Sequence, residues 1–257
     1  MFRFKFIVIL IIFVVGANFA MARQVLPPDI IKITKTIEAP TTGEIGKTYF
    51  YCTNGEKCST EQVVREYYKN RGYSVMRAEH AFWRAMFTLS FFEEIFSTNM
   101  DQQAYPNDIP FDISRKEFYS NRKMGIDNKY NLIKKSNLKE FINSQIKKHE
   151  SFKTRLLYDT EIEGYPNTVE YFKSPIVQEF LDRIDNKTFT KIIYQIALYP
   201  GDNTRGTPDY IVWNKKELIF VEVKREKEKL REDQITWAEF LIKKKIPYRL
   251  IRVVGQY

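Results

Sequence analysis

Residues 206–224 contain two apolar, strand-like runs, 210–213 and 218–221, and the turn-forming segment 214–217 lies between them. This pattern predicts a β-hairpin. Because successive side chains of a strand point to opposite faces, Glu222 and Lys224 share one face. Folding at the turn brings Asp209 alongside Glu222. We therefore expect two carboxylates and one ammonium group in a single small patch.

A helix and a further strand are predicted after this hairpin. One helical face carries residues at spacings of four, three and four, namely Leu230, Gln234, Trp237 and Leu241. The segment 248–254 then has the pattern of a strand, and a right-handed crossover places it parallel to the second strand of the hairpin. Gln234 is polar on an otherwise apolar face. It either reaches the carboxylate patch or is a satisfied or half-exposed glutamine near the helix start.

The patch formed by Asp209, Glu222 and Lys224 suits a hard divalent cation, because Mg²⁺ and Mn²⁺ prefer carboxylate oxygens as ligands. A cation of this kind assists the hydrolysis of phosphodiesters. The motif is short, so an ordinary amphipathic hairpin with a solvated polar face is the alternative.

The segments GTPDYIVW and FVEVK, followed by the helix with Gln234 and Trp237, resemble the virus-type replication-repair nuclease (VRR-NUC) domain of the PD-(D/E)xK superfamily. Upstream, residues 58–96 and 105–126 resemble the Fanconi-anaemia-associated nucleases, so that the resemblance covers residues 58–254. It implies an α/β (α+β) fold, in which helices flank the mixed sheet of a restriction-endonuclease-like core and a helical subdomain precedes it.

The resemblance also implies a metal-dependent nuclease that uses Mg²⁺ or Mn²⁺ and no small-molecule cofactor. The implied catalytic residues are Glu79, Asp209, Glu222 and Lys224, with Gln234 as a further motif residue. The implied metal ligands are the carboxylates of Glu79, Asp209 and Glu222 and the backbone carbonyl of Val223. Lys224 orients or deprotonates the attacking water, or stabilises the transition state.

Glu79 has an alternative explanation, because it precedes an apolar helix and acids near a helix N-terminus are stabilised by the macrodipole.

A nucleic-acid partner agrees with the formal net charge of +9 and with the lysine-rich stretches 215–231 and 243–252. Such stretches are usually solvated faces, but beside a metal site they contact phosphates. Together with Lys224, Arg84 and Arg205 are candidate nucleic-acid contacts, and Gly206 is expected to let the backbone approach a phosphate or metal, unless it is a plain turn glycine. The resemblance implies DNA cleaved near 5′ flaps and ends, while RNA is left open.

The first 22 residues have the pattern of a secretory signal peptide: Arg3 and Lys5, an apolar run over residues 6–15, and the small residues Ala20 and Ala22. Cleavage after Ala22 predicts an exported protein, periplasmic or secreted. The alternative is an uncleaved membrane anchor, for which the apolar run is short. Membrane association is expected only in that case, and the sequence leaves the oligomeric state open.

Cys52 and Cys58 bracket an Asn-Gly turn signal at 54–55. A small hairpin there predicts an intramolecular disulfide in an oxidising compartment, and two free thiols otherwise. The chain has two cysteines and two histidines, and their spacing is not that of a zinc finger.

Four segments are predicted along the chain. They are the signal peptide (1–22), an irregular stretch with a hairpin (23–58), a helical subdomain (59–157) and the nuclease core (158–257). One expected helix begins at a capping box formed by Ser59 and Gln62, and others run over about 80–97, 137–150 and 175–198. A loop or lid with short helices is expected at 101–128. The alternative functions are an inactive nucleic-acid-binding module and an exported structural or interaction protein.

Overall fold

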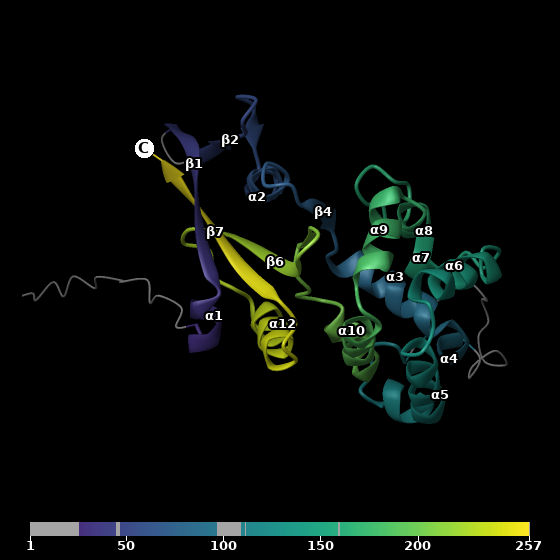
Figure 1. Cartoon of the computed structure of the whole chain (residues 1–257). Coiled ribbons are helices and arrows are strands. Elements are labelled where there is room, and N and C mark those ends of the chain that lie inside the picture. Colours follow the sequence, from purple (N-terminus) through teal and green to yellow (C-terminus); the bar gives the residue numbers. More distant parts are fainter. Residues whose placement is uncertain (1–25, 45–46, 97–108, 111, 159, 257) are drawn as a thin grey trace, which may run out of the picture.

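The computed structural model describes residues 26–44, 47–96, 109–110, 112–158 and 160–256. In Figure 1 a curled seven-stranded sheet occupies one side of the molecule and a group of helices the other. The signal peptide expected at residues 1–22 lies outside the described part of the chain. Within that part, no helix is both long enough and apolar enough to cross a membrane.

The sheet is mixed, with the strand order β3-β2-β1-β7-β6-β5-β4. Its strands are β1 (Thr34–Glu44), β2 (Lys47–Tyr51), β3 (Lys57–Cys58), β4 (Ser74–Arg77), β5 (Tyr210–Trp213), β6 (Leu218–Arg225) and β7 (Tyr248–Gln256). β7 is parallel to both of its neighbours, β6 and β1, and the other pairs are antiparallel. The predicted hairpin and the predicted parallel crossover are therefore confirmed, together with a mixed sheet flanked by helices.

The helices are α1 (Pro28–Lys32), α2 (Thr60–Lys69), α3 (His80–Ser90), α4 (Phe92–Phe96), α5 (Glu117–Ile133), α6 (Leu138–Lys148), α7 (Arg155–Tyr158), α8 (Thr168–Phe172), α9 (Pro175–Arg183), α10 (Asn186–Leu198), α11 (Pro200–Asn203) and α12 (Glu232–Lys243). The predicted capping box is present at the start of α2. The Ser59 hydroxyl accepts from the Gln62 amide at 3.2 Å, and the Gln62 side chain accepts from the Ser59 amide at 2.7 Å.

Residues 23–58 differ from the sequence interpretation. Instead of being irregular, their described part supplies α1 and three strands of the sheet. β1 pairs with β7 as far as Pro40 and then with β2, and Ile37 and Ala39 bury alternate side chains. The misleading signal is Pro40 with the small polar residues after it, which resemble a turn. A proline is tolerated in this position because β1 changes its partner there.

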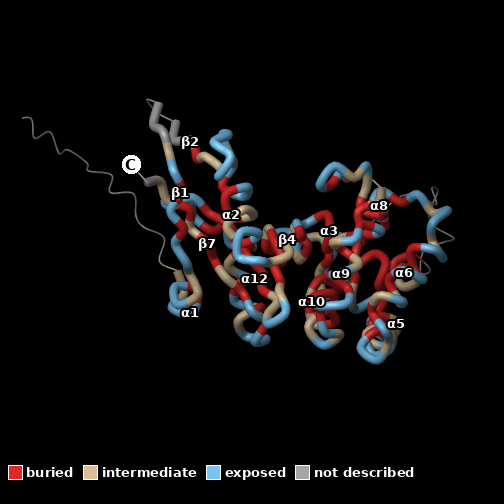
Figure 2. Tube along the Cα trace, turned by 45° about the horizontal axis from the view of Figure 1, so that its top comes forward, coloured by how far each residue is buried: buried red, intermediate tan, exposed pale blue. Residues whose placement is uncertain are grey.

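Two hydrophobic cores lie on the two faces of the sheet. In Figure 2 the buried residues are red and occur in both halves of the molecule. On one face Val221 and Val223 of β6 pack with Val64 and Tyr68 of α2. The other face carries Phe220 into a larger core shared with α12 and the helical half. Because side chains alternate along a strand, residues 222 and 224 belong to this second face.

The helix expected over residues 80–97 is divided into α3 and α4 at Phe91, which leaves helical geometry with φ −126° and ψ 32°. The strand β4 before it was not expected. Short helices were expected at 101–128, but the helix that begins there, α5 at Glu117, is 17 residues long. A buried ion pair between Arg122 of α5 and Asp112 stabilises this region. The sequence pattern did not predict the pair, because both residues are polar and look solvent-exposed from the local sequence.

The nuclease core is predicted from the sequence to begin at residue 158, after Leu157. Helices α8, α9 and α10 follow that position in sequence, yet they pack on α3, α5 and α6, which precede it. The helical half therefore includes residues from both sides of the expected boundary, and a single apolar core joins it to α12 and the sheet.

Candidate active site

The site is built at the end of the β5–β6 hairpin. Tyr210 pairs with Val221 in the antiparallel register, so Asp209, directly before β5, lies opposite Glu222. The Asp209 carboxylate accepts a hydrogen bond from the Val223 amide at 2.7 Å. The Asn214 side chain closes the turn by accepting from the amides of residues 216 and 217.

Glu222 is held from two sides and is only 1% exposed. Its Oε1 lies 2.8 Å from the Lys224 ammonium and accepts from the Gln234 amide group at 2.5 Å. Gln234 in turn accepts from the backbone amide of Arg231 at 3.0 Å, and Lys224 also pairs with Glu228 at 3.2 Å. Gln234 is thus a satisfied glutamine that reaches the carboxylates through Glu222.

Both carboxyl groups resist ionisation in this setting. Burial raises the pKa of Asp209 to about 6, against the hydrogen bond from Val223 and the charge of Lys224. Burial and the charge of Asp209 raise the pKa of Glu222 to about 8. Burial by itself would lower the pKa of Lys224, but the charge of Glu222 and the hydrogen bond to it raise this pKa above its ordinary value. Near neutral pH the two carboxyl groups therefore share a proton that a metal ion would displace.

The donor set fits a divalent cation incompletely. Within the described residues no group of three or more His, Cys, Asp and Glu side chains is arranged to hold a metal ion. The buried Glu222 and the partly buried Asp209 would supply two carboxylate ligands, and their pKa values are raised mainly because burial disfavours the charged form. This set suits an ion such as Mg²⁺, which commonly binds one or two carboxylates and keeps several waters.

Glu79 lies at the rim of the site rather than with the two central carboxylates. It is the N-cap of α3, its side chain is 38% exposed, and it accepts from the Arg77 guanidinium at 2.6 Å. It is close to the site nonetheless, because the amide of Ala78 donates to the Asp209 carbonyl at 3.0 Å and the charge of Glu79 contributes to the raised pKa of Asp209.

The N-termini of two helices, α3 and α12, lie at the carboxylates, where the sequence predicts Glu79 and Gln234 at helix starts. The first turn of α12 supplies Gln234, and α3 begins beside Asp209. The first turn of α2 is tied to the hairpin, because the Tyr210 hydroxyl donates to the Glu61 carbonyl at 3.3 Å. The N-terminus of a helix carries partial positive charge and binds anions such as phosphate.

Arg84 and Arg205 lie near the start of α3. Arg84 donates to the Thr160 hydroxyl at 3.0 Å. Burial, followed by the charges of Arg84 and Arg205, lowers the pKa of His80, which places both arginines near that ring.

Gly206 has a different role from the expected approach to a phosphate or metal. Its φ is +70°, and a Cβ there would lie 2.5 Å from the carbonyl carbon of Asp233, in the first turn of α12. The glycine therefore allows the loop before Asp209 to pack directly against the backbone of α12.

Cys52 and Cys58 are joined by a disulfide, with their Cα atoms 5.6 Å apart. The bond closes the β2–β3 hairpin on the opposite face of the sheet from Glu222.

The family model for the VRR-NUC domain matches residues 142–255. The chain contains a VRR-NUC domain. It is also distantly homologous over most of its length to Fanconi-associated nuclease 1, as the resemblance implied. The homolog of that protein from Oryza sativa subsp. japonica is 25% identical over 254 residues, which cover 88% of this chain and 25% of the relative. The Arabidopsis thaliana homolog is 24% identical over 212 residues, covering 77% and 22%.

The fold agrees with this homology. The crystal structure of paFAN1 bound to 2nt 5′ flap DNA with gap superposes with a TM-score of 0.69 at 19% identity, covering 92% of this chain and 39% of paFAN1. The same protein bound to 1nt 5′ flap DNA gives a TM-score of 0.71. The VRR-NUC chain spans about a quarter of the length of the curated relatives it matches.

Proposed function

We propose that this VRR-NUC protein is a nuclease that hydrolyses phosphodiester bonds of DNA with a divalent cation, Mg²⁺ or Mn²⁺, held by Asp209 and Glu222. The observation that carries the proposal is the buried Glu222 carboxyl group opposite the partly buried Asp209, both with raised pKa values and beside one lysine, in a domain of this family. The Val223 carbonyl and Glu79 are the nearest candidates to complete the ligand set.

In this mechanism the cation and the side chains around it have separate roles. A bound cation lowers the pKa of a water and offsets the charge that develops on phosphate. Gln234 and Lys224 hold the Glu222 carboxylate in one orientation from two sides. Because the pKa of Lys224 is raised, its amine stays protonated at neutral pH, which favours stabilising the transition state over accepting a proton. The N-termini of α3 and α12 attract the phosphate.

The substrate class is proposed from the structural relatives. The solved paFAN1 complexes contain 5′ flap DNA, and the chain corresponds to 39% of paFAN1. We therefore infer a preference for flaps and ends over closed duplex. Labelled flap, nicked, single-stranded, blunt-duplex and RNA substrates compared at fixed salt test this preference, and equal cleavage of all of them together with a closed circle contradicts it.

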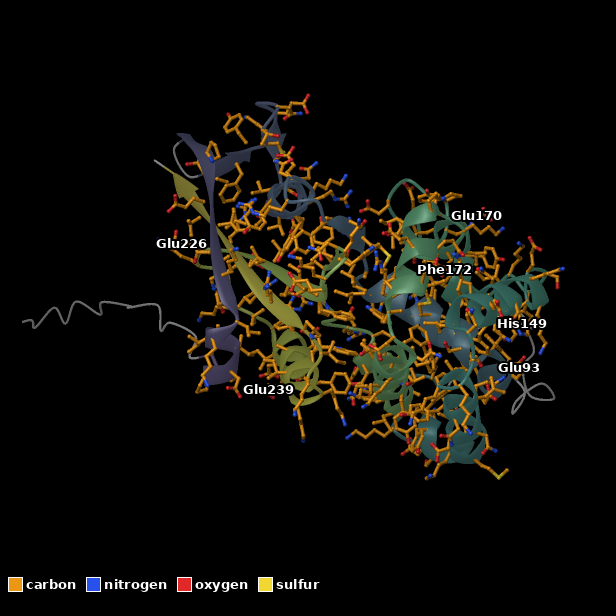
Figure 3. The ribbon with its side chains drawn as sticks, in the orientation of Figure 1. Glu93, His149, Glu170, Phe172, Glu226 and Glu239 are labelled. Atoms are coloured by element: carbon orange, nitrogen blue, oxygen red, sulfur yellow. A yellow bond between two sulfur atoms is a disulfide. The ribbon has the colours of Figure 1, made fainter. Side chains whose placement is uncertain are left out.

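Cleavage itself is tested by variants of the central residues. Asp209→Asn, Glu222→Gln and Lys224→Gln should each lower turnover by about 10³-fold or more, since each removes a group that acts on the transition state. EDTA should abolish cleavage by the wild type. The matched control is Glu226→Gln, an exposed acid just after β6 (Figure 3), which should cleave at the wild-type rate.

The same series separates the alternatives. Wild-type rates in Glu222→Gln reject the assignment of the site. Binding of DNA without cleavage under any metal condition indicates the inactive module, and neither binding nor cleavage indicates a structural or interaction protein.

Export is a further part of the proposal, resting on the leader pattern in residues 1–22 and on the Cys52–Cys58 disulfide. Mass spectrometry of the native protein should find Arg23 at the N-terminus and a mass two hydrogens below that of the reduced chain. A soluble cytoplasmic protein that retains Met1 contradicts it. Reduction should cost about 2 kcal/mol of stability, because the closed loop is short.

A further inference from the structure

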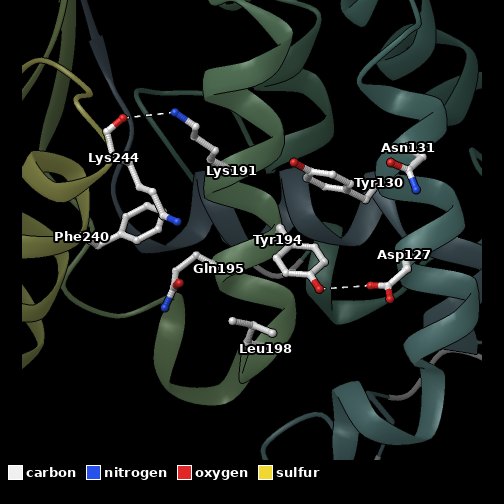
Figure 4. A pocket seen from close by; sticks show the side chains of 9 residues that line it. All are labelled: Asp127, Tyr130, Asn131, Lys191, Tyr194, Gln195, Leu198, Phe240 and Lys244. Carbon is white, nitrogen blue, oxygen red and sulfur yellow. Dashed lines mark hydrogen bonds between the residues drawn. The ribbon is translucent and has the colours of Figure 1, made fainter.

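A cavity with a volume of about 510 Å³ lies between α5, α10 and α12, and none of the residues that line it belongs to the carboxylate site. Cavities of the same volume occur beside β7 and on α5, so size does not distinguish it. Its lining does. Figure 4 shows aromatic rings, lysines and a carboxylate facing one space from three helices.

The aromatic part of the lining consists of Tyr130, Tyr194 and Phe240. The rings of Tyr130 and Tyr194 meet edge to face with their centroids 5.0 Å apart, and Phe240 meets Trp237 in the same way at 5.3 Å. All three lining rings are partly exposed. Partly exposed rings in such positions are stacking surfaces for nucleobases.

Positive charge lies at one end of the cavity. Lys191 of α10 donates to the carbonyl of Lys244 at 3.1 Å, just past the C-terminus of α12 (Figure 4). Residues 243–245 are three consecutive exposed lysines. This end therefore supplies ammonium groups for a phosphate.

Hydrogen-bond acceptors lie at the other end. The Asp127 carboxylate accepts from the hydroxyl of Tyr194 at 3.1 Å and from that of Tyr119 at 2.9 Å, and it pairs with Lys123. The hydrogen bond from Lys123 lowers the pKa of Asp127, so this carboxylate stays ionised. An ionised carboxylate in a cavity is suited to accept from the exocyclic amino group of a base.

We propose that this cavity binds a nucleotide, with the base against Tyr130 and Phe240 and the phosphate at Lys191 and Lys244. The inference rests on the proposed function, because α12 connects the two sites: its first turn holds Glu222 through Gln234, and its end lines the cavity. A helix of 12 residues spans about 18 Å, so a strand bound here leads to the carboxylates over a few nucleotides. The nucleotide belongs to such a strand or is free.

The test measures binding in EDTA, so that it does not depend on cleavage. A fluorescein-labelled oligo-dC is titrated at fixed salt and followed by anisotropy. Tyr130→Ala should weaken binding about tenfold, the effect of losing one stacked base, whereas Tyr130→Phe keeps the ring and should bind within about twofold of the wild type. Lys191→Gln should weaken binding more than Lys147→Gln, which removes the same charge from an exposed position on α6.

Unlabelled dCMP distinguishes the two sources of the nucleotide. Displacement of the oligonucleotide by dCMP in the wild type, but not in Tyr130→Ala, assigns the cavity to free nucleotides. Tight oligonucleotide binding that dCMP does not displace assigns it to a strand. Wild-type affinity in both Tyr130→Ala and Lys191→Gln overturns the proposal, whatever the cleavage assays show. Circular dichroism of each variant verifies folding, and Lys191→Gln remains decisive if Tyr130→Ala does not fold.

Discussion

The helical half of the molecule buries one carboxylate with one guanidinium, whereas the sheet half places one buried and one partly buried carboxyl group beside a single ammonium. The side chains of Asp112 and Arg122 are 7% and 2% exposed and meet through two N–O contacts of 2.5 and 3.1 Å. The guanidinium also donates to the Glu94 carbonyl at 2.9 Å. Its charge is therefore balanced and its donors are largely used.

The carboxylate site is unbalanced by comparison. Asp209 and Glu222 face each other, and Lys224 supplies a single positive charge. Burial raises the pKa values of both acids, and the charge of Asp209 raises that of Glu222 further. A buried ion pair whose charges balance holds two elements together. A cluster with more carboxyl groups than cationic groups is suited to bind a cation. A third cluster, around Glu93 and His149, lies at the outer end of the helical half in Figure 3, away from β6.

The largest effect on stability is expected from breaking the balanced pair. Asp112→Asn leaves the Arg122 guanidinium buried without an opposite charge, which should cost about 3–5 kcal/mol of the free energy of unfolding. Denaturant unfolding measures this loss. Activity per folded molecule should be unchanged, because the pair lies in the helical half.

The matched control is Asp29→Asn, which breaks an exposed ion pair with Lys32. The Lys32 side chain is 74% exposed and the Asp29 side chain is 68% exposed. It should change stability by less than about 1 kcal/mol. A similar loss in both variants would show that burial does not distinguish the two pairs.

The unbalanced site should respond to pH in the absence of metal. The folded pKa of Glu222 is about 8, above its ordinary value of 4.5, so its stabilising contribution is present at low pH and is lost as pH rises from about 4.5 through 8. Metal binding displaces the same proton. Affinity for Mn²⁺ should therefore rise about tenfold for each pH unit between about 6 and 8.

Glu222→Gln checks this interpretation because glutamine resembles the protonated acid. Thermal unfolding of the metal-free variant should depend less on pH over that range than unfolding of the wild type. Calorimetric titration at pH 6, 7 and 8 measures the metal affinity, and a flat affinity would show that the carboxyl groups are already ionised.

The sequence predicted the centre of the site because that part depends on local geometry. The two-residue period fixes which face Glu222 and Lys224 share, and the turn at 214–217 fixes that Asp209 lies opposite. The Gln234 helix and the parallel β7 followed from periodicity and crossover handedness. Each of these features is encoded within about 20 residues of the next.

The parts that the sequence did not reveal depend on contacts between distant segments. β1 joins the sheet through β7, more than 200 residues later in the chain, and the Asp112–Arg122 pair stabilises a region that reads locally as a polar loop. The position of Glu79 outside the central pair depends on its ion pair with Arg77. Gly206 was assigned to a ligand because local sequence does not show that α12 packs against it.

The final prediction tests how far the Glu222 site depends on this close packing. In Gly206→Ala the new methyl group would meet the backbone of Asp233 and the amide of Gln234 at 2.5–2.7 Å, and backbone atoms cannot move aside as a flexible side chain does. The first turn of α12 must shift, which should lengthen the bond from Gln234 to Glu222. We expect a loss of about 2 kcal/mol in stability and a lower turnover with little change in DNA affinity.

Gly72→Ala is the matched control, because Gly72 has a similar φ of +75° but no atom within 4 Å of an added Cβ. It carries the backbone strain alone and should cost about 1 kcal/mol without affecting turnover. The comparison of the two variants separates strain from displacement of α12. Equal turnover in both variants would show that the site tolerates movement of Gln234 and that Lys224 alone holds Glu222 in place. A loss of turnover confined to Gly206→Ala would show that catalysis depends on the packing of α12.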